Sequence, residues 1–225
     1  MPLLCSPAIA TALESLDLLR ALHEGPGGPI DLAQAYSCLP YGGGVPDDLA
    51  LEDQDYPHLI FAVVHRGNND VLRYIAEQLV SIRKDPHAAD SWGGTPLYVA
   101  AWQGQEPCVR ALVELGGDPN QADSYGRTPC FIAAQQGHES CIRALVELGG
   151  DPNQATSGGS MSIHTAAMNG RDNSVVALIE AGVDINARDQ NALHTACFHG
   201  HTNAIPTLIE AGVDINARDH SGRNG

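Results

Sequence analysis

The densest group of side chains that could do chemistry lies in residues 194–201. This run holds three histidines and one cysteine at short spacing: His194, Cys197, His199 and His201. Imidazole nitrogens and thiolate sulfur are the ligands that zinc prefers in proteins. The run would therefore form a metal centre if its backbone made the four side chains converge.

Repetition along the chain argues against that reading. His164 and His194 occupy corresponding positions in two similar segments, and His138 and His201 each follow a corresponding glycine. The packing of a repeated structural unit explains such recurring residues better than one metal centre does. We therefore expect no metal at this run and no cofactor on the chain.

The other patterns also point away from an enzyme. Gly42, Gly43 and Gly44 lack the Lys-Ser/Thr that completes a phosphate-binding loop. No pair of carboxylates and no nucleophile next to a general base stands out. We expect no catalytic residues and no enzymatic activity.

The six cysteines of the chain do not suggest disulfide bonds. Cys108 and Cys141 hold the same position in adjacent similar segments. Neighbouring helical units pack roughly 10 Å apart, whereas a disulfide requires Cα atoms within about 7 Å. Reduced thiols are typical of the cytosol, so we expect an intracellular, cytoplasmic protein.

A repeated unit of 33 residues must position all of these side chains, because residues 123–155 restate residues 90–122. In the second copy, Thr128 suits a helix N-cap and Pro129 the first helical position. Gly137 suits the end of this first helix. A second helix follows over residues 139–148, with apolar residues on one face. Two short helices cannot bury both faces alone, so the units must stack.

This pattern resembles the ankyrin repeat. The matching residues are Thr128, Pro129, Ala133, Ala134, Gly137, His138, Leu145, Val146, Gly150, Asp151 and Asn153. The resemblance covers roughly three-quarters of the chain, from residue 53 onward. It implies helix pairs joined by hairpin-like loops, with the loops and first helices forming a concave surface that binds proteins.

The fold class that we predict is an all-α ankyrin-repeat solenoid with a helical N-terminal extension. Its predicted segments are a capping helix (1–24), a Gly/Pro-rich acidic linker (25–52), a degenerate first repeat (53–89), three repeats (90–122, 123–155, 156–188), a shortened repeat (189–218) and the start of a truncated repeat (219–225). A free amphipathic partner-binding helix is the alternative for 1–24.

Three details depart from the regular pattern. Met161 and Ser162 replace the usual Thr-Pro, so we expect Ser160 or Ser162 to cap that helix. The loop after residue 188 is three residues short, with Asn191 able to cap the next helix. Because no polar capping repeat follows, we expect a fragment of a longer protein, and a monomer. A dimer through the uncapped C-terminal end is the alternative.

The positions outside the repeated framework are the candidates for partner binding. The resemblance places one of them per unit on the concave side, directly after the Ala-Ala pair, and aromatic residues also recur in the loops. The predicted protein-binding residues are Trp92, Trp102, Tyr125, Arg127, Gln135, Met168 and Phe198. The alternative for Trp102 and Phe198 is packing between loops and helices, and we assign Tyr98 and Phe131 to packing.

Two asparagines lie in a recurring run that looks like the surroundings of hydroxylated asparagines in ankyrin domains. Residues 178–187 recur at 208–217, which makes Asn186 and Asn216 candidates for hydroxylation. The alternative is that both side chains only satisfy backbone groups of the loops.

Charge narrows the class of partner. The net charge of −15, with only 12 basic residues, argues against nucleic acid and against an anionic membrane. No apolar run reaches the length of a membrane span. We expect a non-catalytic scaffold or adaptor that binds a neutral or basic protein. The alternative is a regulatory or targeting arm of a longer enzyme whose catalytic part lies outside this chain.

Overall fold

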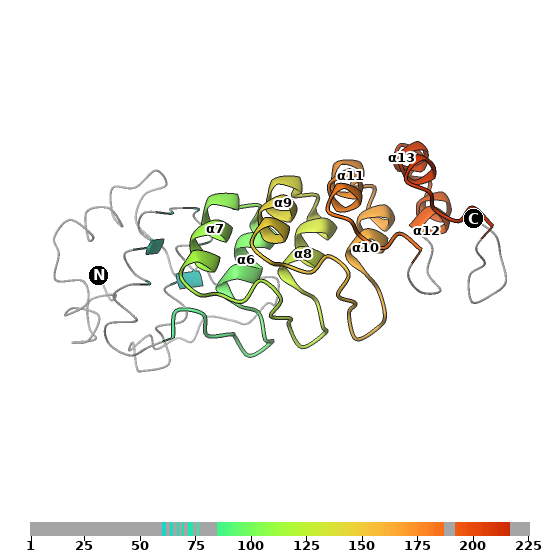
Figure 1. The fold of residues 1–225 in the computed structure, drawn as a ribbon. Coiled ribbons are helices and arrows are strands. Elements are labelled where there is room, and N and C mark those ends of the chain that lie inside the picture. The colour runs from blue at the N-terminus through green and yellow to red at the C-terminus, as the bar shows by residue number, and fades with distance from the viewer. Residues whose placement is uncertain are drawn as a thin grey trace, which may run out of the picture.

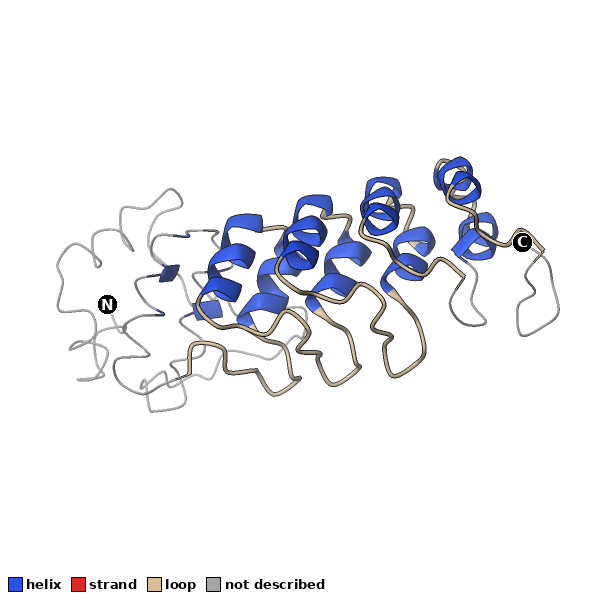
Figure 2. Ribbon diagram, in the orientation of Figure 1, coloured by secondary structure: helices blue, strands red, loops and turns tan. Residues whose placement is uncertain are grey.

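A computed structural model describes residues 85–186 and 192–216, together with residues 60, 61, 64, 67, 69, 72, 73 and 76. Within these residues the regular structure is helical throughout (Figure 2). The helices are α6 (Pro96–Gln103), α7 (Glu106–Glu114), α8 (Pro129–Gln136), α9 (Glu139–Glu147), α10 (Ser162–Met168), α11 (Asp172–Glu180), α12 (Ala192–His199) and α13 (Ala204–Glu210). The predicted helix pairs are therefore confirmed from residue 96 onward.

The helices form two rows. In Figure 1 the inner helices α6, α8, α10 and α12 lie below the outer helices α7, α9, α11 and α13. Each helix packs against its partner in the same unit and against the corresponding helix of the next unit. Long loops project from the side of the inner helices. The chain is thus an elongated stack, as the repeat predicted.

The predicted helix boundaries follow from local chemistry. The Thr128 hydroxyl accepts a hydrogen bond from the backbone N–H of Phe131 at 3.1 Å, and Pro129 begins α8. Thr95 caps α6 in the same way. Gly137 ends α8 in the left-handed conformation at φ 93°, which costs glycine little because it has no Cβ.

The expected capping of α10 by Ser160 or Ser162 is wrong. The N-cap residue is Met161, and Ser162 is already inside the helix and buried. The ring nitrogen Nδ1 of His164 lies 3.2 Å from the backbone nitrogen of Met161 and accepts its hydrogen bond. The side chain of the third helical residue therefore satisfies the N–H of the N-cap residue, while the backbone N–H of His164 donates to the Met161 carbonyl at 3.1 Å in place of a capping hydroxyl.

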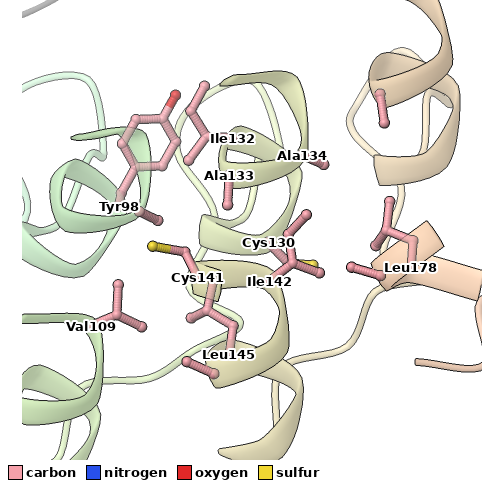
Figure 3. Packing of buried hydrophobic residues seen from close by; sticks show 14 of the residues in the cluster. Tyr98, Val109, Cys130, Ile132, Ala133, Ala134, Cys141, Ile142, Leu145 and Leu178 are labelled. Atoms are coloured by element: carbon pink, nitrogen blue, oxygen red, sulfur yellow. The ribbon is translucent and has the colours of Figure 1, made fainter. Parts of the chain in front are cut away.

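The core runs along the stack between the two helix rows. Ala133 and Ala134 are fully buried, and Figure 3 shows Ala133 among Tyr98, Ile132 and the core of its own unit. Small side chains at these positions allow adjacent inner helices to approach closely. Tyr98 and Phe131 are buried, so their assignment to packing is confirmed.

Asparagine side chains connect successive turns. The Oδ1 atom of Asn120 accepts from the backbone N–H of Asp151 at 2.7 Å, and its Nδ2 donates to the carbonyl of Gly149 at 3.0 Å. Asn153 accepts from Asp184 N–H at 2.8 Å. One amide per unit thus fixes the distance between neighbouring turns.

A second connection covers the glycines that follow two of the inner helices, α6 and α10. A Cβ atom on Gly104 would lie 2.6 Å from Nδ1 of His138 in the next unit, and Gly170 relates to His201 in the same way. Only a residue without a side chain fits beneath these rings. Stacking and helix termination therefore depend on the same glycines.

Several predictions fall outside the described residues. They are the helix over 1–24, the linker over 25–52, the cap at Asn191, the short loop after residue 188 and the segment 219–225. The degenerate first repeat is described only at single positions. Among these, Gly67 has a φ of 67°, as expected for a glycine that ends a helix.

Candidate protein-binding surface

Four of the predicted binding residues form one row. Trp102, Gln135, Met168 and Phe198 hold equivalent positions in α6, α8, α10 and α12, at or next to the last residue of each helix. Because these helices are stacked neighbours, the four positions follow each other along the inner side. We call this row the inner stripe.

The members of the inner stripe differ in exposure. Phe198 is 69% exposed and Met168 is 41% exposed, whereas Trp102 is partly buried against the core. The ring of Phe198 meets the ring of His199 edge to face at 5.1 Å. The alternative of packing therefore describes Trp102 in part, and Phe198 does not pack into the core.

Backbone contacts hold the stripe in place. The carbonyl of Trp102 accepts a hydrogen bond from Nε2 of His138 at 3.0 Å, and the carbonyl of Gln135 accepts from Nε of Arg171 at 3.3 Å. A carbonyl can only accept, so Nε2 of His138 carries the proton. Trp102 and Gln135 are thus each tied to the unit that follows.

Trp92 and Tyr125 lie at the same place in two adjacent loops. They are 43% and 52% exposed. The backbone N–H of Ser124 donates to the carbonyl of Trp92 at 2.9 Å, and Ser157 N–H donates to the carbonyl of Tyr125 at 3.0 Å. Neighbouring loops therefore hold each other and present large aromatic rings on fixed backbone.

Arg127 has a role within its own loop. Its guanidinium lies 2.6 Å from the carboxylate of Asp123, whose side chain is 1% exposed. The same guanidinium lies 5.0 Å from the ring centre of Tyr125 and 5.8 Å from that of Tyr98. Arg127 was predicted as a protein-binding residue, and in the structure its charge is paired with a buried acid and holds Tyr125 in place.

Comparison with known families agrees with this architecture. A family model described as "Ankyrin repeats (3 copies)" matches residues 9–123, 59–156 and 148–219. The chain belongs to the ankyrin-repeat family. Ankyrin repeats are generally protein-interaction modules and are typically not catalytic. No match to a curated protein accompanies this family match.

The histidines and the cysteine of the last ankyrin unit do not converge. The ring centres of His199 and His201 lie 6.4 Å apart, and the two rings are nearly parallel. The Nδ1 atom of His199 forms a hydrogen bond with the carbonyl of Thr195 at 2.9 Å. The ring of His201 packs over Gly170. In the part of the chain that the structure describes, no three His, Cys, Asp or Glu side chains gather as they would around a metal ion.

The four cysteines within the described ankyrin units are free thiols. Burial raises the pKa of Cys108 to about 11 and the pKa values of Cys130 and Cys141 to about 12. Thiols with such high pKa values stay protonated near neutral pH and are poor nucleophiles. Cys197 is the exposed one of the four.

Asn186 continues the row of bridging asparagines. Its Oδ1 accepts from the backbone N–H of Asp214 at 2.8 Å, and its Nδ2 donates to the carbonyl of Gly212 at 3.2 Å. The amide of Asn186 therefore satisfies backbone groups of the next turn, which is the role that we gave as the alternative to hydroxylation. Hydroxylation of Asn186 and Asn216 stays a prediction.

Two exposed aliphatic side chains were not predicted. Ile209 is 49% exposed and Ile215 is 53% exposed, although their counterparts Ile179 and Ile185 pack partly against the core. Among the described residues no unit follows α13 to cover them. The sequence could have indicated them, because Ile209 and Ile215 repeat the positions of Ile179 and Ile185.

No described helix has the length and apolar character needed to cross a membrane.

Proposed function

We propose that this chain is a non-catalytic scaffold or adaptor that binds a protein partner along the inner stripe and the neighbouring loops. The observation that carries the proposal is the exposure of Phe198 and Met168 on adjacent inner helices. Equivalent positions further along the stripe hold different residue types, as expected for a surface that is not needed for stacking. Exposed large apolar side chains on rigid elements are typical of binding sites.

The loop aromatics extend the proposed surface. Trp92 and Tyr125 stand on loops that project from the same side as the inner helices (Figure 1). Aromatic side chains contribute large contact area at low cost in conformational entropy. Arg127 contributes by holding Tyr125 rather than by offering an unpaired charge.

Photo-crosslinking in source cells tests this proposal. A benzophenone amino acid is placed at position 198 and, as a matched control, at position 209, which is an exposed aliphatic position on an outer helix. We expect a partner that crosslinks from 198 but not from 209, and that is lost when Met168→Ala is added. The same proteins from both positions, or none from 198, would refute the inner stripe as the binding site.

A further inference from the structure

The inner row differs in charge from the outer row. The four described inner helices contain no Asp, Glu, Lys or Arg. Every described outer helix carries at least one acidic residue, and ion pairs such as Arg110–Glu147 and Arg143–Glu180 cross between neighbouring outer helices. The chain's strong negative charge is therefore not borne by the inner helices.

This distribution restricts what can lie on the inner stripe. A charged side chain buried against it would lose hydration, and no opposite charge on these helices would compensate it. An apolar or neutral side chain meets the exposed surfaces of Met168 and Phe198 without that cost. Contacts with these helices therefore favour an uncharged part of a partner.

The spacing of the stripe restricts the conformation of that partner. Equivalent positions on stacked helices recur at about 8–10 Å. A polyproline II segment advances about 9.3 Å in three residues, and every third side chain lies on the same face. A β-strand repeats its faces after two residues, or about 6.8 Å, which does not match the stripe.

The polar side chains of the surface favour a partner in the polyproline II conformation over an α-helical partner. An α-helix with contacts every seven residues, about 10.5 Å apart, would also match the spacing. However, the stripe and the positions next to it offer the side-chain amides of Gln135 and Gln136, which are half-buried and can both donate and accept. A polyproline II backbone leaves its N–H and C=O groups available to such amides, whereas a helix uses its own.

We propose that the inner stripe binds an uncharged, extended segment of polyproline II type, about ten residues long, with every third side chain meeting one unit. The side chains that meet Trp102, Met168 and Phe198 are apolar, and the one that meets Gln135 is small or polar. This inference rests on the proposed function and specifies its partner.

The probe is a phage-displayed library of random twelve-residue peptides, selected on the full chain. A Met168→Ala/Phe198→Ala variant serves for counter-selection, and Ile209→Ala/Ile215→Ala serves as the matched control for loss of exposed apolar area. Circular dichroism and thermal melting check that both variants fold. We expect enriched peptides with few charged residues, with proline, and with apolar residues three apart. The first variant should bind them at least about tenfold more weakly, and the control variant should bind them unchanged.

A second measurement tests the spacing directly. One residue is inserted between two apolar anchors of an enriched peptide, which should weaken binding at least about tenfold because the anchors then face different sides. Peptides that are highly charged, that place anchors seven apart, or that tolerate the insertion would overturn this inference and leave the proposed function standing. Failure to enrich any peptide would overturn it as well. Peptides that bind the Met168→Ala/Phe198→Ala variant as well as the wild type would refute the inner stripe itself.

Discussion

Substitution of Gly104 by alanine tests whether the stacking contact over this glycine contributes to stability. Gly104 has a φ of 74°, where an L-residue with a side chain costs about 1–2 kcal/mol. The new Cβ would also lie 2.6 Å from Nδ1 of His138, so the ring must move. Movement breaks the 3.0 Å hydrogen bond from His138 Nε2 to the carbonyl of Trp102, which is worth about 0.5–1.5 kcal/mol. We expect Gly104→Ala to lower the free energy of unfolding by about 1.5–3.5 kcal/mol.

The matched control is Gly200→Ala. Gly200 holds the equivalent position after α12 with a φ of 75°, but no atom of the described residues lies within 4 Å of the place its Cβ would take. Only the backbone cost of about 1–2 kcal/mol applies there. Urea unfolding followed by circular dichroism, together with hydrogen exchange for local opening, measures both variants.

A double-mutant cycle separates the two costs at one site. In a His138→Ala background the ring is absent, so Gly104→Ala should cost only the backbone term and resemble Gly200→Ala. If Gly104→Ala costs the same with and without His138, the ring does not constrain this glycine and the reasoning is refuted.

Four further predictions address the cap, the thiols (two predictions) and the asparagine. Thr128→Ala should lower the free energy of unfolding by about 1 kcal/mol, with Thr128→Ser close to wild type, because the hydroxyl caps α8; thermal unfolding measures both. Native labelling with iodoacetamide at pH 8 should modify Cys197 among the described cysteines and spare the three buried ones, as read by peptide mass spectrometry. Folding raises the pKa values of the buried thiols, so their contribution to the free energy of unfolding should be constant below the ordinary thiol pKa of 9.0. Above that pH it should fall by about 1.4 kcal/mol per pH unit for each thiol, until the folded thiols also ionise. A free energy of unfolding that rises above pH 9 would contradict this. Intact-mass analysis of protein from its source should show one added oxygen if Asn186 is hydroxylated, and an unmodified mass would remove that prediction for that source.

Local chemistry made the framework predictable. Thr128 and Gly137 mark the two ends of one helix by a hydroxyl acceptor and a left-handed conformation, and both effects act within a few residues. The 33-residue period then supplied the long-range arrangement, since copies of one unit bury their apolar faces only by stacking. This is why helix pairs, buried Tyr98 and buried Phe131 all followed from the sequence.

The details that were missed depend on three-dimensional neighbours. The ring of His164 points back and accepts from the backbone N–H of Met161 at the start of α10, and counting hydroxyl groups near the helix start does not reveal that. Arg127 stands four residues after Asp123, yet only the closed loop shows that the acid is buried and that the pair holds Tyr125. A charge that looked available for a partner is thus used inside the loop.

The inner stripe shows why a framework predicts where binding occurs but not which residues dominate it. Trp102 and Phe198 occupy the same position, yet one is half-buried and the other is largely exposed. The bridging amides recur at Asn120, Asn153 and Asn186, and a histidine ring packs over the glycine after α6 and over the glycine after α10. These contacts set the spacing of the stripe independently of the side chains that it carries. The repeated framework therefore sets the spacing of the stripe, while the variable side chains determine the affinity for a partner. A partner of this surface must satisfy both, which is the physical basis for expecting contacts at a fixed three-residue interval.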